Sequence, residues 1–289
     1  MCRLFGLHAG SEPIRATFWL LDAPGSLAVQ SERNPDGFGI ATFEPDGTVD
    51  LDKRPVRAAD DELFLREAHE ECSRVYLAHV RYADTGAPSP ANTHPFVQDG
   101  RAFAHNGVVR DLDRIEREVG EEVASLVLGD TDSERLFAAV TKAIRDHDGD
   151  VWAGIVAATR RLAAEVELYS LNFLLATPDN LWALRYPEHN DLFLLERAPG
   201  GAGGHHHLDE ASARGTLRLV SGEGVDRRVV VVASEPMDEN PGWGAVAPGE
   251  LVHIGPDLRV TREVILPDPP AKPMQLRGRA AASQAQERD

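Results

Sequence analysis

MCRLFG, residues 1–6, opens the chain and places a cysteine in the second position. Removal of Met1 would leave Cys2 with a free α-amine beside its own thiol. A thiolate is a strong nucleophile, and an adjacent base can activate it. The α-amine has an unperturbed pKa of about 7.7–8.0, so it can accept and return a proton near neutral pH. Cys2 is either a nucleophile with its own general base or an incidental cysteine, and the rest of the chain decides between them.

The composition limits the classes of function. A chain of 289 residues can form one large domain or two smaller ones. The net charge of −17 argues against a nucleic-acid partner, which would require a basic face. The two cysteines, Cys2 and Cys72, are too few for a disulfide framework and lack zinc-site spacing. We expect a cytoplasmic protein with no membrane partner, since the N-terminus lacks a signal-peptide pattern and the apolar runs are strand-sized.

Hydrophobic periodicity predicts strands, then two long helices, then strands again. The two helices are expected at 131–146 and 151–165, and the first has the Thr131/Glu134 spacing of a capping box. Shorter helices are expected at 14–21 and 60–71. Strands are expected at 2–9, 36–41, 75–80, 101–104, 171–176, 181–186, 192–195, 217–220, 229–233 and 251–254. This order indicates mixed sheets with helices on the outside.

Two segments are expected to be flexible. Residues 199–207 form a Gly-rich loop that ends in the histidine run 205–207, and no acidic or cysteine partner is spaced to complete a metal site. The tail 267–289 is Pro-rich and then Ala/Gln/Arg-rich, so we expect it to be disordered. The predicted domain is therefore 2–266, with no cofactor and no metal.

Four short motifs carry polar side chains at predicted strand ends or at a helix start. Arg81 ends a buried strand and offers a planar fork suited to a carboxylate. The motif at 92–96 contains His94. Asn106 with the backbone N–H of Gly107 could form a two-donor oxyanion hole. Asp132 places a carboxylate in the first turn of a helix.

Each motif also has a purely structural interpretation. Arg81 could pair with a surface acid, and His94 could hydrogen-bond within a turn. Asn106-Gly107 is a common turn dipeptide, and Asp132 could serve only the helix dipole. Together the motifs match one chemistry, in which a thiol attacks a γ-glutamyl amide, an oxyanion hole holds the intermediate, and an arginine and an aspartate hold the amino-acid end.

In these motifs the chain resembles the class II glutamine amidotransferases, which are N-terminal-nucleophile hydrolases. The resemblance rests on ordered motifs at 1–6, 36–40, 79–81, 92–96, 105–107 and 131–134. A later stretch, 233–236 with 242–243, resembles the small stand-alone members, including the amidohydrolase of ergothioneine biosynthesis. The similarity covers nearly the whole chain apart from the tail.

The resemblance implies an α+β fold, a four-layer αββα sandwich, with 2–266 as the amidotransferase domain. It implies a γ-glutamyl thioester on Cys2 that water resolves, and Asn106 and Gly107 as the oxyanion hole. Arg81 would bind the α-carboxylate of the substrate and Asp132 its α-ammonium. His94 would support the loop between Arg81 and Asn106 without a chemical step.

One position departs from the family pattern. Many members have a threonine three residues after the arginine, where this chain has Asp84 followed by Thr85. An acidic side chain there would repel a carboxylate unless it points away or pairs with a base. The details of carboxylate recognition, and with them the substrate, therefore stay open.

Four functions are compatible with these observations. The chain could be a stand-alone amidohydrolase that removes glutamate from a larger γ-glutamyl metabolite, which we favour because no synthase-like domain follows. It could be a glutaminase subunit that supplies ammonia to a separate synthase. It could also be a non-catalytic scaffold that binds glutamine-like ligands, or a structural protein in which Cys2 is incidental.

Overall fold

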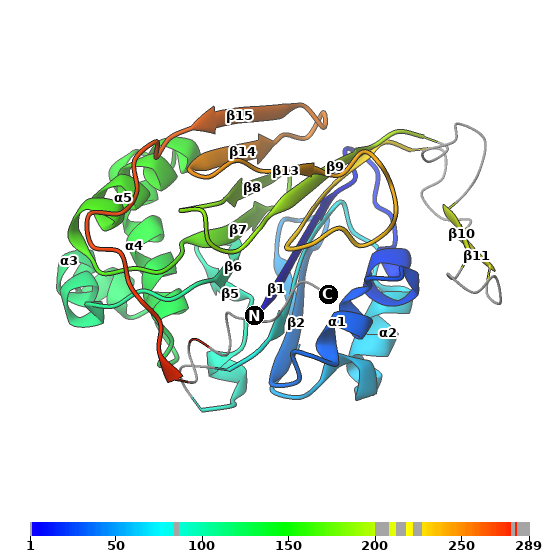
Figure 1. The fold of residues 1–289 in the computed structure, drawn as a ribbon, viewed down its shortest axis with the longest axis horizontal. Helices are drawn as coiled ribbons and strands as arrows, with labels where there is room; N and C mark the ends of the chain where they lie inside the picture. Colours follow the sequence, from blue (N-terminus) through cyan, green and yellow to red (C-terminus); the bar gives the residue numbers. More distant parts are fainter. Residues whose placement is uncertain are drawn as a thin grey trace.

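The computed structural model describes residues 2–83, 87–199, 208–211, 218–221, 227–278 and 281. Met1, Asp84, Thr85 and the histidine run 205–207 lie outside these described residues. The described part of the chain forms two large antiparallel sheets with helices on both outer sides (Figure 1).

The first strand shows why the chain forms stacked sheets. All six residues of β1 (Arg3–His8) are buried, so both faces of the strand are covered. Phe5 and Leu7 belong to one apolar cluster, and Leu4 belongs to another. Because successive side chains of a strand point to opposite faces, these two clusters lie on opposite sides of the sheet. Phe5 and Leu7 therefore share one face of β1, and Leu4 lies on the other.

The first sheet has seven strands in the order β13-β9-β12-β1-β4-β2-β3, and all its pairings are antiparallel. Its strands after β1 are β2 (Gly37–Phe43), β3 (Val49–Arg54), β4 (Val75–Arg81), β9 (Phe193–Arg197), β12 (Val229–Ala233) and β13 (Gly244–Ala245). The start of β1 therefore lies beside the end of β4, with Arg3 opposite Val80.

The second sheet has six strands in the order β15-β14-β8-β7-β6-β5, again antiparallel throughout. Its strands are β5 (Phe96–Gln98), β6 (Arg101–Asn106), β7 (Asn172–Thr177), β8 (Asn180–Leu184), β14 (Glu250–Ile254) and β15 (Val260–Val264). A separate pair consists of β10 (Leu208–Ala211) and β11 (Arg218–Ser221).

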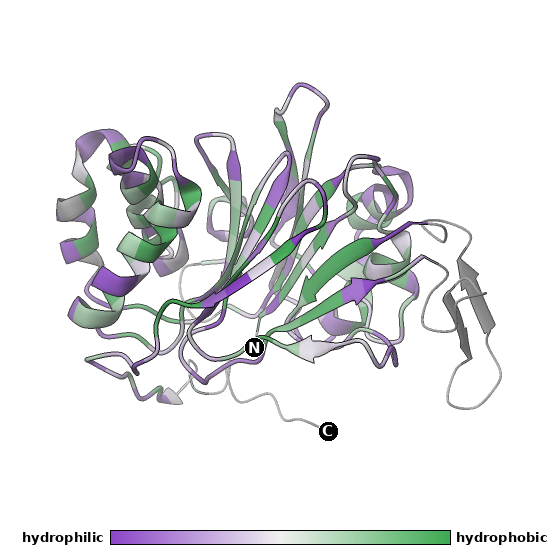
Figure 2. Ribbon diagram, turned by 90° about the horizontal axis from the view of Figure 1, so that it is seen from above, coloured by the Kyte–Doolittle hydropathy of each residue, from purple (hydrophilic) through white to green (hydrophobic). Residues whose placement is uncertain are grey.

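Helices cover the outer face of each sheet, which gives four layers (Figure 1). The first sheet is covered by short helices and the second by three longer ones (Figure 1). Along the longer helices, hydrophilic and hydrophobic residues alternate (Figure 2). The helices are η1 (Phe18–Asp22), α1 (Leu27–Ser31), η2 (Ala58–Asp60), α2 (Glu62–Glu70), η3 (Pro90–Asn92), α3 (Leu112–Ala124), α4 (Asp132–Asp146) and α5 (Val151–Glu165). The predicted four-layer αββα sandwich of the α+β class is confirmed.

Small side chains let the two sheets pack closely. The layer between the sheets includes Ala41, Ala104 and Ala183 beside larger residues such as Leu174. At Gly6, an added Cβ would lie 3.0 Å from Leu181 Cδ2 and 3.1 Å from Leu174 Cδ1. A larger residue at position 6 would therefore push the sheets apart where β1 crosses the second sheet.

The long helices begin as the sequence predicts, with one difference. The Thr131 hydroxyl accepts a hydrogen bond from Glu134 N at 3.2 Å. The Glu134 carboxylate, however, accepts from the backbone N–H groups of Leu128 and Gly129 rather than from that of Thr131. Only half of the expected capping box forms, because the Glu134 side chain instead fixes the loop before the helix.

The expected helix at 14–21 is wrong in its first half. Ile14 forms a β-bridge with Ser73, and each backbone N–H of the pair donates to the other's carbonyl oxygen. Helical structure begins only at Phe18. The helix α3 was not predicted from the sequence, although its buried residues Ile115, Val119 and Val123 recur at a spacing of four.

The first part of the predicted tail is packed on the domain. Met274 is buried, and its N–H donates to Leu168 O at 2.9 Å. Ala271 N donates to Ala163 O of α5, also at 2.9 Å. The expectation of disorder from Pro267 onward is therefore incorrect for 267–274, because apolar side chains and backbone groups there find partners on the domain.

Among the described residues, no helix is long and apolar enough to span a bilayer.

The packing between the sheets predicts a strong effect of truncating Leu174. Leu174→Ala should lower the free energy of unfolding by about 2–5 kcal/mol, since it opens a cavity between two rigid sheets. Leu128→Ala is the matched control, because Leu128 is 81% exposed and its loss should change stability by less than about 0.5 kcal/mol. Urea unfolding measures both; equal effects would contradict the assigned packing.

Candidate active site

Cys2 lies where the first sheet places the start of β1 against the end of β4. Its thiol is partly buried, and Tyr82 N donates a hydrogen bond to Sγ at 3.3 Å. The thiol lies 3.5 Å from Tyr82 O, to which it can donate. A backbone N–H directed at the sulfur stabilises negative charge there. Cys72, by contrast, is exposed.

Asn106, at the end of β6, reaches from the second sheet to the cysteine. Its side-chain Nδ2 donates to Cys2 O at 3.0 Å, and the residue is only 1% exposed. At Gly107, an added Cβ would lie 2.1 Å from Ser170 O and 2.6 Å from His105 Nε2. Position 107 therefore requires glycine for reasons of space, and Cys2 and Asn106 are brought together across the two sheets.

Arg81, the last residue of β4, is also buried and directly precedes Tyr82. Asp36 fixes the chain on both sides of Tyr82, since Asp36 N donates to Arg81 O at 3.0 Å and Ala83 N donates to Asp36 Oδ2 at 2.8 Å. The motif that begins at Asp36 thus holds the strand end that carries both Arg81 and the contact to Cys2.

Asp132 is the first residue of α4 and is 4% exposed. Its Oδ2 accepts a hydrogen bond from Val109 N at 2.8 Å. Val109 lies three residues after Asn106, so Asp132 is fixed to the segment that follows the Asn106-Gly107 pair. Asp132 is thereby linked to the end of β6 that carries Asn106.

His94 takes part in a buried aromatic stack. Its ring centroid is 4.3 Å from that of His79 and 4.5 Å from that of Phe96. Burial lowers the pKa of His79 to about 3 and holds the pKa of His94 well below its usual range. Both rings are thus neutral at physiological pH, which agrees with a supporting role for His94 rather than proton transfer.

Lys53, on β3, is a residue that the sequence analysis missed. Its ammonium donates to Thr93 O at 2.8 Å and to Pro95 O at 3.1 Å, on either side of His94. Burial lowers the pKa of Lys53 to about 8, while the Glu134 carboxylate acts in the opposite direction. The signal was present, since alternation along β3 puts Lys53 on the same face as the apolar Val49 and Leu51.

The loop that carries His94 also contacts the start of α4. Asn92 is buried, and its Oδ1 accepts from Asp130 N at 2.8 Å. Its Nδ2 donates to Ala87 O at 3.0 Å. The loop is therefore held by Lys53 on one side and joined through Asn92 to the residues that precede Asp132.

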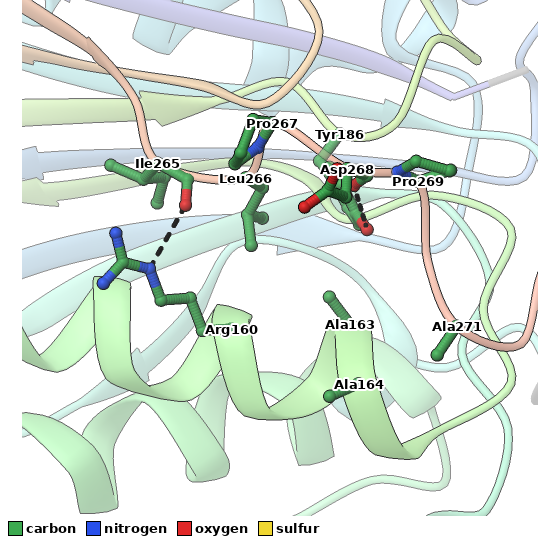
Figure 3. Close-up of a pocket in the computed structure, with 10 residues that line it drawn as sticks. All are labelled: Arg160, Ala163, Ala164, Tyr186, Ile265, Leu266, Pro267, Asp268, Pro269 and Ala271. Atoms are coloured by element: carbon green, nitrogen blue, oxygen red, sulfur yellow. Dashed lines mark hydrogen bonds between the residues drawn. The ribbon is translucent and has the colours of Figure 1, made fainter.

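A pocket of about 370 Å³ lies elsewhere, between α5 and residues 265–271 (Figure 3). Arg160 Nε donates to Ile265 O at 3.2 Å along one side, and Tyr186 donates its hydroxyl proton to Asp268 O at 3.1 Å. None of the predicted site residues lines it. Nor does any group of three or more His, Cys, Asp or Glu suited to a metal ion occur within the described ranges.

Comparison with known proteins gives a family and its fold. Residues 1–264 match the family described as "Glutamine amidotransferases class-II". The chain is 29% identical over 265 residues to the γ-glutamyl-hercynylcysteine sulfoxide hydrolase of Mycobacterium tuberculosis, covering 88% of this chain and 93% of that protein. It is 28% identical over 236 residues to an uncharacterised protein of Methanocaldococcus jannaschii, covering 78% of this chain and 63% of that protein.

A solved structure supports the fold. The glutamine aminotransferase class-II domain protein from Silicibacter pomeroyi superposes with a TM-score of 0.58 at 20% identity, covering 91% of this chain and 98% of that one. At this identity the likeness shows the fold alone.

The pKa of Lys53 predicts how stability depends on pH. An unfolded lysine keeps its proton to about pH 10.4. Between about pH 8 and 10 the unfolded chain therefore binds more protons than the folded one, and the free energy of unfolding should rise with pH. Relative to Lys53→Met, the wild type should gain about 1–2 kcal/mol over this window. Urea unfolding at several pH values tests this, and parallel curves for the two proteins would contradict it.

Proposed function

Because the chain belongs to the class II glutamine amidotransferases, which are enzymes of the N-terminal-nucleophile amidohydrolase kind, we propose that it hydrolyses a γ-glutamyl amide through a thioester on Cys2. The products are glutamate and the released amine. The observation that carries this proposal is the position of Cys2, with Tyr82 N–H directed at its sulfur and the Asn106 amide on its carbonyl oxygen.

The first half of the reaction forms the thioester. After removal of Met1, the Cys2 α-amine takes the thiol proton and Sγ attacks the amide carbonyl carbon, giving a tetrahedral oxyanion. Asn106 Nδ2 can donate two hydrogen bonds and gives one to Cys2 O, which leaves the other for this oxyanion. Gly107 N–H is the second donor. Breaking the C–N bond passes the proton from the α-ammonium to the leaving amine.

The second half reverses these roles. Water attacks the γ-glutamyl thioester while the α-amine accepts its proton, the C–S bond breaks, and the thiol is regenerated with release of glutamate. No cofactor enters either half. His94 and Lys53 take no chemical step in this mechanism. Their role is to hold the loop between Arg81 and Asn106.

Arg81 and Asp132 are proposed to hold the amino-acid end of the substrate. A guanidinium matches the planar geometry of the α-carboxylate, and a carboxylate matches the α-ammonium. Both residues are buried. Arg81 directly precedes Tyr82, whose backbone N–H donates to Cys2 Sγ, and Asp132 accepts a hydrogen bond from Val109 N, three residues after Asn106. Asp84 also bears on how the α-carboxylate is recognised, and it lies outside the described residues.

Two versions of this function differ in the leaving group. Similarity over 93% of the length of a γ-glutamyl hydrolase supports a stand-alone enzyme whose substrate is a larger γ-glutamyl metabolite. Membership of an amidotransferase family supports the alternative, a glutaminase that supplies ammonia to a separate synthase. A scaffold without catalysis would instead bind such ligands and turn none over.

Glutamate release tests the proposal directly. The purified protein, with its N-terminal residue determined, is incubated with L-glutamine and with γ-glutamyl amides of bulkier amines. We expect release by the wild type and none by a folded Cys2→Ala variant, because the nucleophile is lost. Cys72→Ala is the matched control and should be fully active, since Cys72 is exposed and outside the site.

The substrate panel separates the versions. Faster release from bulky γ-glutamyl compounds supports the stand-alone hydrolase, and faster release from glutamine supports the ammonia-supplying subunit. An active Cys2→Ala variant would refute the thioester mechanism, and binding without release by a chain that begins at Cys2 would support the scaffold.

A further inference from the structure

The backbone carbonyl of Asn106 is held by two side chains that the mechanism above does not use. Asn190 Nδ2 donates to Asn106 O at 3.3 Å, and Ser170 Oγ lies 3.2 Å from the same oxygen. Both residues are buried, so these contacts are shielded from water. Neither residue belongs to a motif predicted from the sequence.

This carbonyl belongs to the same peptide group as Gly107 N–H. A peptide group is planar, so fixing the direction of its oxygen also fixes the direction of the N–H on the opposite side. Hydrogen bonds to the oxygen polarise the group and make the N–H a stronger donor. Contacts on Asn106 O therefore control where and how strongly Gly107 N–H donates.

Of the two contacts, the one from Asn190 faces less competition from other acceptors. Ser170 has a single hydroxyl proton and lies within reach of two acceptors, Asn106 O and Asn172 Oδ1, the latter at 3.1 Å. Asn190 has no such competing acceptor in the described structure. Turning its amide over would put Oδ1 against the Asn106 oxygen, so the carbonyl itself selects the orientation with Nδ2 inward.

Asn190 is held in place by its own backbone. Its φ is +59°, in the left-handed region that asparagine tolerates better than most residues. Its carbonyl oxygen accepts from Asn172 Nδ2 at 2.5 Å, and Asn172 Oδ1 accepts from Tyr186 N at 2.9 Å. The donor on Asn106 is thus anchored to β7 and to the loop that follows β8.

We propose that Asn190, assisted by Ser170, is a positioning residue that orients the Asn106–Gly107 peptide for oxyanion binding. The inference rests on the proposed function, in which Gly107 N–H is one of the two oxyanion donors. It assigns to the loop after β8 a role in transition-state stabilisation without contact to the substrate.

Asn190→Gly tests this with little change of backbone, because glycine accepts a φ of +59° and only the donor is lost. The kcat for glutamate release should fall on the order of tenfold, the effect of about one hydrogen bond, with KM unchanged. Asp148→Gly is the matched control, since Asp148 is exposed, has a φ of +54° and lies in the turn after α4. It should leave both constants unchanged.

An NMR measurement tests the geometry independently of activity. Asn106-Gly107 is the only Asn-Gly pair in the sequence, so labelling with ¹³C-carbonyl asparagine and ¹⁵N-glycine isolates the Gly107 amide signal. Asn190→Gly should shift this signal, because the hydrogen bond on Asn106 O is lost, and Asp148→Gly should leave it in place. Ser170→Ala provides a second variant, with a smaller fall in kcat, if Asn190→Gly does not fold.

The outcomes separate this inference from the proposed function. If Asn106→Ala lowers kcat while Asn190→Gly changes neither kcat nor the Gly107 signal, the positioning role is wrong and the function stands. If the wild-type chain beginning at Cys2 releases no glutamate, the proposed function fails. If, in addition, Asn190→Gly leaves the Gly107 signal unmoved, the claim that Asn190 orients the Asn106–Gly107 peptide is refuted as well.

Discussion

The close contact between the two sheets is the constraint on which the candidate site depends. Gly6 and a set of alanines allow β1 to lie against the second sheet, as the short distances from a hypothetical Cβ at position 6 indicate. Because the sheets are this close, the amide of Asn106 on β6 can reach the carbonyl of Cys2 at the start of β1. A wider separation would leave the thiol and the Asn106-Gly107 pair on different layers.

The two histidines on β4 and in the loop after it carry no charge that could compete for protons. His79 and His94 are buried and neutral, and their rings pack against each other. The Lys53 ammonium is directed at two backbone carbonyls. Proton transfer is thus left to the Cys2 α-amine in the proposed mechanism, and the surrounding polar groups orient backbone segments.

Much of the fold could be read from the sequence, because its signals are local. The patterns at 2–9 and 131–146 predict a strand and a helix, and the structure has β1 at Arg3–His8 and α4 at Asp132–Asp146. The family motifs also indicated Cys2 and Asn106, which the structure brings into contact. Local patterns failed where a distant partner decides the conformation, as at Ile14, which pairs with Ser73, and at Met274, which packs beside Leu168. Lys53, Ser170 and Asn190 were missed for a related reason, since each acts on a backbone carbonyl far along the chain.

The central claim is that Cys2, freed of Met1, carries the γ-glutamyl group. The most direct measurement is peptide mass spectrometry of the enzyme quenched in acid during turnover of a γ-glutamyl amide. The account predicts a γ-glutamyl group on a peptide that begins at Cys2, absent before substrate is added. Turnover with the acyl group on another residue, or by a chain that retains Met1, would contradict it.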